Sequence, residues 1–284
     1  MNANNRLSRP PRVLLNVDRS ATIRSVKVGA LNVRSLGNKS VTILQTIVDE
    51  KLDLLAVVES WHDSAESPSV VASTPPGYYV VERARPRTGR AVTSMKTNHG
   101  ELCVFIRSDL QVNVIDFRRY KSFELLPLFV RICAMSFVYI LVYRPRPAST
   151  VADRFFDEWA DVLERTSDYA GCLIVGDVNL HVDDFTNTST ERFLTLLTSF
   201  GQRDYVGRPT HGDHQLDVFV SRSDQPAPVV KLDSQLISDH SLIVALFEVT
   251  DYHPARTSCR HVVKRRPWRS FNFDALPPTL KNQN

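Results

Sequence analysis

The sequence contains few of the residues that build stapled, fibrous or metal-ribbon proteins. Its 284 residues include only four Cys, ten Gly and 16 Pro. The cysteines lie far apart with no CxxC pair, which argues against a disulfide scaffold and against a cysteine-rich zinc module. The glycines show no three-residue period, which excludes collagen. The 43% of apolar residues instead predicts a folded globular protein, and the spaced cysteines suit a reducing compartment.

Long apolar runs are also missing. A membrane span needs roughly 20 apolar residues, and the longest candidate, residues 125–143, is interrupted by Pro127 and Arg131. This segment therefore predicts two buried strands. The N-terminal sequence MNANNRLSRPPR has no apolar stretch typical of a secretory signal. We expect an intracellular protein, in the nucleus or the cytoplasm, with no membrane partner.

The net charge of +4 is unevenly distributed. Residues 1–27 and residues 251–284 each carry +5, which leaves −6 on the body between them. Basic ends on an acidic body suit contact with a polyanion and a carboxylate-rich metal site, although solubilising tails explain the charge equally well. Both ends lack hydrophobic periodicity. Residues 1–22 are therefore expected to be a flexible basic tail, and residues 251–284 a basic tail or linker.

The body alternates many apolar strands with a few helices. Strands are predicted at residues 26–33, 52–58, 78–81, 101–106, 112–117, 128–134, 137–143, 172–175, 216–220, 229–232 and 242–249. The apolar faces of three helices are predicted to be Val41, Leu44, Ile47 and Val48; Val151, Phe155, Trp159 and Val162; and Phe193, Leu196, Leu197 and Phe200. The strands between residues 78 and 143 are expected to form a hairpin meander, and residues 83–97 an exposed loop. The series predicts one α/β domain, residues 23–250, with two packed sheets, mostly antiparallel or mixed, flanked by helices.

Polar residues follow or end several of the predicted apolar strands. They are Asn32, Glu59, Tyr143, Asp177 with Asn179, Asp217, and Asp239 with His240. Each has an ordinary explanation when taken singly, as a turn former, a helix cap or a solvated loop residue. Together they favour a ligand site, because ligands of α/β proteins bind where strands end.

The chemistry of this set suits hydrolysis of a phosphodiester. Carboxylates such as Glu59 and Asp239 are the oxygen ligands that a hard divalent cation prefers, so Mg²⁺ is expected, with Mn²⁺ as a substitute. Amide, phenol and imidazole groups supply hydrogen-bond donors for the charge that develops on the phosphate. An Asp217 carboxylate beside His240 would fix one imidazole tautomer and favour its cationic form.

The ordered motifs LNVRSLGNK, VVESW, VYRP, GDVN, PTH, LDVF and SDHS carry a resemblance to a known family. In this order they resemble the endonuclease/exonuclease/phosphatase superfamily, whose fold is a four-layer α/β sandwich. The resemblance extends from about residue 26 to residue 249. Within the superfamily, the sequence is most similar to the apurinic-like endonuclease domain of non-LTR (LINE-type) retrotransposons. Several motifs in a fixed order are far more specific than a single GDVN.

The resemblance implies a role for each polar position. Metal binding falls to Glu59, Asn32 and Asp239, and catalysis to Asp177, His240, Asp217, Tyr143 and Asn179. Substrate binding falls to Asn32, Thr210 and Ser238. Arg146 stands where relatives carry Pro or an amide, so Arg144 and Arg146 are expected to add phosphate contacts.

The function implied by the resemblance is a Mg²⁺-dependent DNA endonuclease that nicks one strand by in-line attack of water and leaves a 3′-hydroxyl. Its partners would be DNA and, in a longer polyprotein, a reverse transcriptase domain. Two alternatives keep the fold: another phosphoesterase, such as an inositol phosphatase or a ribonuclease, or a remnant that binds DNA without cleaving it. None of the motifs predicts a target sequence or an oligomeric state.

Overall fold

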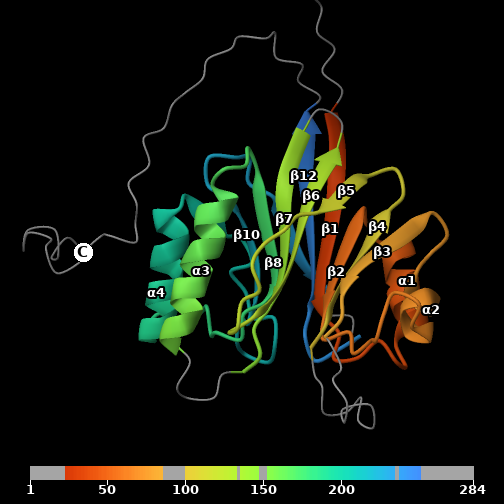
Figure 1. The fold of residues 1–284 in the computed structure, drawn as a ribbon, viewed down its shortest axis with the longest axis horizontal. Helices are drawn as coiled ribbons and strands as arrows, with labels where there is room; N and C mark the ends of the chain where they lie inside the picture. Colours follow the sequence, from red (N-terminus) through yellow and green to blue (C-terminus); the bar gives the residue numbers. More distant parts are fainter. Residues whose placement is uncertain (1–22, 86–99, 133–134, 147–151, 234–236, 251–284) are drawn as a thin grey trace, which may run out of the picture. The chain divides into compact units, whose positions relative to one another are not determined.

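Two six-stranded β-sheets form the body of the fold (Figure 1). The computed structural model describes residues 23–85, 100–132, 135–146, 152–233 and 237–250. The predicted tails, residues 1–22 and 251–284, and most of the predicted loop 83–97 lie outside the described residues. The first sheet has the order β11 (Val229–Asp233), β12 (Leu242–Thr250), β1 (Ile23–Asn32), β2 (Leu54–Val58), β4 (Leu102–Arg107) and β3 (Tyr78–Arg83). The second has the order β5 (Gln111–Val114), β6 (Glu124–Ile132), β7 (Met135–Tyr143), β8 (Cys172–Asp177), β10 (Asp217–Arg222) and β9 (Gln202–Asp204).

Both sheets share one pattern of strand directions. The central pair of each is parallel, β1 with β2 and β7 with β8, and the neighbouring pairs are antiparallel. A parallel pair needs a crossover connection, which α1 (Ser40–Asp49) and α3 (Ala152–Thr166) provide. The mixed, mostly antiparallel sheets are thus confirmed. Because the paired strands run the same way, their carboxyl ends meet at one edge of each sheet.

Helices cover the outer face of each sheet and complete four layers (Figure 1). Helices α1 and α2 (Pro68–Ser73) lie on the first sheet, and α3 and α4 (Thr188–Ser199) lie on the second. Three apolar cores fill the gaps between layers. The core under α3 contains the fully buried Phe155, Trp159 and Phe193, and burying one large apolar side chain contributes about 1.5–3 kcal/mol. The predicted four-layer α/β sandwich is confirmed.

Helix α1 turns a different face toward its sheet from the one predicted. Its buried residues are Ser40, Ile43, Thr46 and Ile47, whereas Val41 is 65% exposed and Val48 is 50% exposed. The segment holds two overlapping apolar stripes, and periodicity alone did not distinguish them. The predicted faces of α3 and α4 are confirmed at their described positions; Val151 lies outside the described residues.

The strands between residues 78 and 143 do not form one meander. Strands β3 and β4 pair in the first sheet, whereas β5, β6 and β7 pair in the second. Alternation of apolar residues shows that a strand has a buried face, but it does not show which sheet the strand joins. Two short elements, α2 and β9, were not predicted, because their six and three residues are too few for a periodic signal. Among the described residues, no helix has the length and apolar character needed to span a bilayer.

Candidate active site

Strand ends from both sheets bring the predicted polar residues to one place. In the second sheet, Tyr143 ends β7 beside Asp177 at the end of β8. Asp177 in turn lies opposite Asp217, the first residue of β10. In the first sheet, Asn32 ends β1, and Glu59 follows the end of the neighbouring β2. The site is therefore assembled by topology from positions far apart in the sequence.

A buried hydrogen-bond network joins the two sheets at this edge. The Asn32 Nδ2 atom donates to Glu59 Oε1 and to Asp177 Oδ2, at 2.9 Å in each case. The backbone N–H of Asn179 donates to Asp177 Oδ1 at 2.8 Å. Asn32 and Asp177 are each 1% exposed. A single amide thus connects a carboxylate of the first sheet to a carboxylate of the second.

Asp177 lies in an environment that disfavours its charge. Burial raises the pKa of Asp177 well above its ordinary value, and the negative charge of Asp217 raises it further. His240 and the hydrogen bonds from Asn32 and Asn179 oppose this shift without cancelling it. A carboxyl group tuned upward in this way is suited to accept a proton near neutral pH.

His240 is held by a second buried carboxylate. Its Nδ1 lies 2.7 Å from Asp217 Oδ2, and the two residues are 5% and 3% exposed. Because the carboxylate accepts, Nδ1 carries the proton, and Nε2 is the ring atom left for other partners. Burial acts to lower the pKa of His240, but the hydrogen bond and charge of Asp217 outweigh it, so the pKa lies above its ordinary value.

Thr210 lies against the start of β10, where Asp217 is located. It is 1% exposed, and its Oγ1 accepts from the backbone N–H groups of Leu216 and Asp217 at 3.1 Å each. The hydroxyl oxygen accepts from two backbone donors and so helps to fix the start of β10. The predicted substrate contact of Thr210 stays a prediction.

Tyr143 and Glu59 form a neighbouring part of the site. Burial raises the pKa of Tyr143, and the charge of Glu59 together with its hydrogen bond to the phenol raises it further. The phenol therefore stays protonated and acts as a donor. Glu59 (φ +53°) and Asn179 (φ +45°) both adopt the left-handed region, which costs about 1–3 kcal/mol for a residue other than Gly and is common at functional sites.

The first residue of the GDVN motif must be glycine for steric reasons. A Cβ atom on Gly176 would lie 1.9 Å from the Val142 carbonyl oxygen. No side chain fits there, because β8 passes too close to β7. Gly176 therefore allows the approach that places Asp177 beside Tyr143.

Asp239 lies at the more exposed side of the site. Its Oδ2 pairs with Arg34 at 2.5 Å and lies 3.2 Å from His211 Nε2, while the Ser238 hydroxyl donates to Oδ1 at 3.1 Å. Burial acts to raise the pKa of Asp239, but the hydrogen bond and charge of Arg34 lower it to about 2. Arg34 and His211 were missed as site residues, although they lie within the LNVRS and PTH motifs.

The site contains the oxygen donors that a hard divalent cation prefers, in the carboxylates of Glu59 and Asp239. Both carboxylates lie near Lys39: burial lowers the pKa of Lys39, while these two charges oppose that shift. Two groups of ligand atoms, each within 4.8 Å, occur among the described residues: His211, Asp239 and His240; and Asp177, Asp217 and His240. Glu59 belongs to neither group.

The predicted role of Asn32 as a metal ligand stays a prediction. In the structure its Nδ2 atom faces Glu59 and Asp177 and donates to both. Its Oδ1 accepts from the backbone N–H of Arg34 at 3.1 Å. The structure thus makes Asn32 the donor that holds two carboxylates together.

The two arginines expected to contact phosphate have different environments. Arg144 is 3% exposed; its guanidinium donates to the carbonyl oxygens of Val178 and Asn179 and lies 4.4 Å from the Phe155 ring centre. It supports the GDVN loop from the inside, and its predicted phosphate contact stays a prediction. Arg146 is exposed. It lines a cavity of about 410 Å³ together with Asn179, His181, His211, His214 and Leu216.

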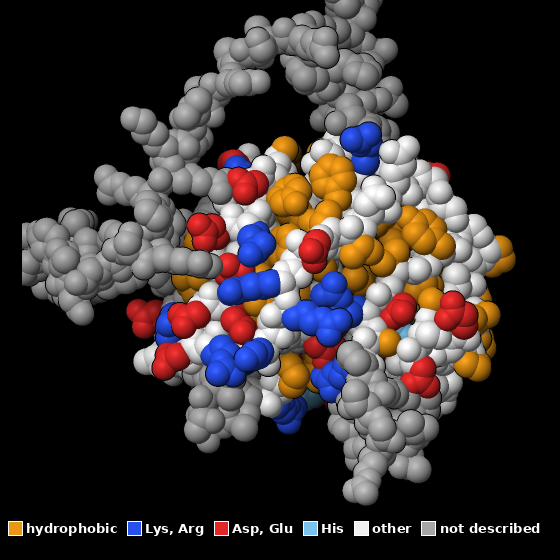
Figure 2. Space-filling view, in the orientation of Figure 1, with side chains coloured by type: hydrophobic (Ala, Val, Ile, Leu, Met, Phe, Trp, Pro, Cys, Tyr) orange, Lys and Arg blue, Asp and Glu red, His pale blue; other side chains and the backbone are white. Residues whose placement is uncertain are grey.

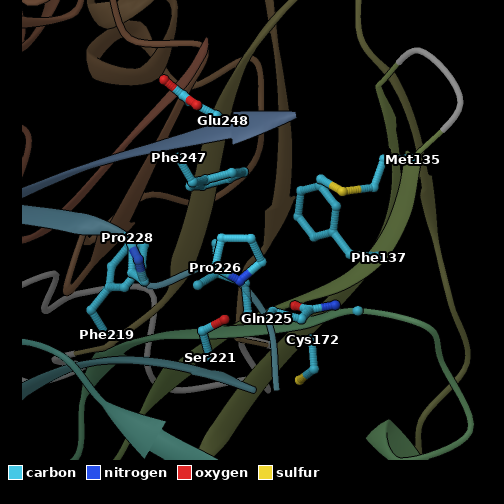
Figure 3. Close-up of a pocket in the computed structure, with 12 residues that line it drawn as sticks. Met135, Phe137, Cys172, Phe219, Ser221, Gln225, Pro226, Pro228, Phe247 and Glu248 are labelled. Carbon is cyan, nitrogen blue, oxygen red and sulfur yellow. The ribbon is translucent and has the colours of Figure 1, made fainter. Parts of the chain in front are cut away.

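A second cavity lies at the opposite end of the same strands (Figure 3). It measures about 150 Å³, and rings such as Phe137, Phe219 and Phe247 line it. Its polar lining residues are Ser221, Gln225 and Glu248. Phe137 and Tyr143 are six positions apart in β7, about 20 Å of extended chain. The apolar cavity therefore contributes nothing to the polar site.

Comparisons with known proteins agree with this fold. A family model described as the Endonuclease/Exonuclease/phosphatase family matches residues 29–240. No protein with a curated description matches the sequence. Similar solved structures include the endonuclease domain of TRAS1, a telomere-specific non-LTR retrotransposon, at 13% identity and a TM-score of 0.56, covering 78% of this chain and 97% of that one.

Two further structures come from other branches of the same fold. The AP endonuclease LMAP from Leishmania major is 14% identical, with a TM-score of 0.60 and coverage of 80% of this chain and 88% of that one. A 3′ phosphatase, NExo from Neisseria, bound to a product DNA hairpin, is 14% identical, with a TM-score of 0.57 and coverage of 80% and 100%. At these identities the likeness shows the fold alone.

Proposed function

The chain belongs to the endonuclease/exonuclease/phosphatase family, and from that premise we propose that it is a divalent-metal-dependent endonuclease that nicks DNA. Members of this family hydrolyse phosphoester bonds, so the coarser activity follows from membership. One observation carries the finer proposal. The buried Asp217–His240 pair lies beside Asp177, which the Asn32 amide links to Glu59 across the two sheets.

The proton chemistry falls to two buried groups. Asp177 orients the attacking water and accepts its proton, a role supported by its raised pKa. His240 donates through Nε2 to a phosphate oxygen, since Asp217 occupies Nδ1 and favours the cationic ring. Water attacks phosphorus in line, the bond between phosphorus and the 3′ oxygen breaks, and the leaving 3′ oxygen takes a proton from solvent to become a 3′-hydroxyl.

Other side chains would stabilise the charge that develops on the phosphate. Tyr143 keeps its phenolic proton and donates it as a hydrogen bond. Asn179 lines the 410 Å³ cavity together with Arg146, whose guanidinium is exposed. A divalent cation bound by the Glu59 and Asp239 carboxylates would supply neutralising charge to the phosphate oxygens. Ser238 holds Asp239 in place.

DNA is the proposed substrate for two reasons. The sequence motifs resemble those of non-LTR retrotransposon endonucleases, and the endonuclease domain of one such element, TRAS1, is a structural neighbour. Cations also surround the site, with Arg34 and Lys39 beside Asp239 and Arg146 on the cavity. On the same grounds, we propose that the chain acts with a reverse transcriptase domain of a longer polyprotein.

The test is nicking of supercoiled plasmid by the purified chain in Mg²⁺ and in EDTA. We expect relaxed circles only with Mg²⁺ or Mn²⁺, and losses of about 10²- to 10⁴-fold in Asp177→Asn and His240→Ala. An exposed aspartate away from the site supplies the matched control for the first variant, Asp224→Asn. Equal nicking by wild type and by both site variants would refute the assignment.

A phosphatase is the second candidate, because a 3′ phosphatase is also a structural neighbour. The two activities differ in their products. Release of inorganic phosphate from a 3′-phosphorylated oligonucleotide, without cleavage of an internal bond, would favour the phosphatase. Nicked circles that carry a 3′-hydroxyl favour the endonuclease.

A further inference from the structure

The segment that connects β5 to β6 carries three cations within four positions. We name residues 115–123 the basic loop; its sequence is IDFRRYKSF. Arg119 and Lys121 are exposed, and the Arg118 side chain is 47% exposed. The nearest acidic residue in the sequence of the loop is Asp116. An exposed basic segment of this kind is ordinarily only a solvated surface. A binding role therefore requires that the backbone of the segment is fixed in one conformation.

The basic loop is anchored through its apolar residues. Phe117 and Phe123 are 6% and 4% exposed and belong to the core beneath α3. Ile115 and Tyr120 pack against the same core, and Tyr120 stacks on Phe123 with ring centres 4.8 Å apart. The apolar positions therefore face inward, while the three cations remain outside.

Helix α3 fixes the loop by hydrogen bonds as well. Glu158 accepts from the backbone N–H groups of Lys121 and Ser122 at 3.0 and 2.9 Å, and from the Ser122 hydroxyl at 2.6 Å. Asp161 accepts from the Tyr120 hydroxyl at 2.8 Å and pairs with Arg118 at 3.0 Å. The backbone is thus held before any ligand arrives, which lowers the entropy cost of binding.

The cations gather on one face of the molecule. Figure 2 shows several Lys and Arg side chains across the middle of one face, with acidic side chains between them. Arg83 is near the basic loop: burial lowers its pKa, and the nearby positive charge of Arg119 lowers it further, against the opposing effect of Asp116. Two cations that repel each other would both gain from an anion bound between them.

The basic loop leads directly into the active site. It ends at Glu124, the first residue of β6, which lies opposite Tyr143. Lys121 is three residues from Glu124, so the chain holds it within about 11 Å of that pair. Phosphates of one DNA strand advance about 3.4 Å along the helix axis. A strand with its cleaved phosphate at Tyr143 would therefore reach the loop within about three nucleotides.

We propose that the basic loop binds the phosphate backbone of the DNA strand beside the cleaved bond, chiefly through Arg119 and Lys121. The inference rests on the proposed function, because it takes DNA as the substrate. Arg118 is already paired with Asp161, so its main role is to hold the loop, with a smaller share in the contact. Contacts to the backbone position the duplex and carry no sequence information.

The test measures binding without cleavage. A fluorescent 20-base-pair duplex is titrated with the full chain in EDTA at several salt concentrations, using wild type and Arg119→Ala/Lys121→Ala. The matched control is Arg131→Ala/Lys231→Ala, which removes two exposed cations from β6 and β11 away from Glu124. Melting temperatures of all three proteins confirm that they are folded.

We expect the loop variant to bind about ten-fold more weakly than wild type, with the slope of log Kobs against log salt reduced by about 1–2. For the control variant, the slope should differ from the wild-type slope by less than about half of the change expected for the loop variant. Equal slopes for wild type and the loop variant would overturn the proposal. Equal losses in the loop variant and the control would also overturn it.

Two further outcomes separate this proposal from the others. If the protein fails to nick plasmid but the loop-dependent binding is found, the proposed endonuclease is wrong and the binding surface stands. If plasmid is nicked but binding does not depend on the loop, the surface is wrong and the endonuclease stands. A polyglutamate peptide that competes as well as DNA at equal charge would assign the loop to an acidic protein partner and overturn the proposal.

Discussion

The same strands have opposite chemistry at their two ends. Strands β7, β8, β10 and β12 run between the active site and the apolar cavity. Near one end lie Tyr143, Asp177, Asp217 and His240, and near the other lie Phe137, Cys172, Ser221 and Phe247. The fold therefore separates function from packing along these strands, over about 20 Å of extended chain in β7.

The polar end contains features that lower the stability of the fold, and the apolar end does not. It buries Asp177 against the charge of Asp217, and it holds Glu59 and Asn179 at positive φ. Such features reduce stability and persist where function requires them. At the apolar end, rings pack against one another, as Phe137 does against Phe247 with ring centres 6.1 Å apart. Substitutions at the two ends should therefore have opposite effects on activity and stability.

The largest effect is expected for Asp217→Asn at the polar end. The hydrogen bond and charge that raise the pKa of His240 are lost, so the ring loses its proton at lower pH. We expect nicking to fall by about 10²- to 10⁴-fold at pH 8 and the alkaline limb of the pH–rate profile to move to lower pH. Single-turnover nicking rates from pH 5 to pH 9 measure both.

Asp224→Asn provides the matched control for that substitution. Asp224 follows the other end of β10, is exposed, and pairs with Arg222 at the surface. Its replacement should leave the rate and the pH profile of nicking unchanged. An unshifted alkaline limb in Asp217→Asn would break the assignment of the proton donor to His240.

Phe137→Ala should produce the reverse result at the apolar end. The ring is 5% exposed and packs edge-on against Phe247, so its removal enlarges an existing cavity. We expect a loss of about 3 kcal/mol in unfolding free energy, or roughly 6–12 °C in melting temperature. The nicking rate per folded molecule at 20 °C should match wild type. A loss of activity in folded Phe137→Ala protein would contradict the claim that the apolar end contributes to stability and not to catalysis.

The smallest effect is a gain of stability in Asp177→Asn. The folded-state pKa of Asp177 lies above its unfolded value, so the stability from this group is complete at acid pH and is lost as pH rises. Asparagine does not ionise, so Asp177→Asn removes the loss of stability at high pH. In EDTA we expect a melting temperature about 2–4 °C above wild type at pH 8, and a smaller difference at pH 5. Calorimetry at the two pH values measures it; a difference that does not grow with pH would contradict the burial of an ionisable Asp177.

The sequence predicted the composition of the site better than the details of its contacts. Asp177, Asp217 and His240 follow or precede apolar strands, and strand ends meet by topology, so their meeting was predictable. The inward turn of Arg144 and the engagement of Thr210 with backbone were not. Each of these side chains bonds to backbone groups that lack another partner among the described residues. Tertiary packing alone determines which backbone groups those are, so the sequence does not predict the contacts.

The fold was likewise predictable in its architecture but not in its details. The order of the apolar segments predicted two packed sheets flanked by helices, and the resemblance to a known family implied the four-layer sandwich. The buried face of α1 did not follow, because Val41 and Ile43 are both apolar and the sheet selects between them. Nor did the change of sheet between β4 and β5, since hairpin alternation is identical in either sheet.

The most direct test of the polar end is an anomalous difference map from crystals soaked in Mn²⁺. We expect a peak on the order of 2 Å from a carboxylate oxygen of Glu59, with Asp239 beside it. We expect no peak at the cavity lined by Phe137 and Phe247. If protein that nicks DNA in Mn²⁺ showed no peak at Glu59, the placement of the catalytic centre at the polar end would be contradicted.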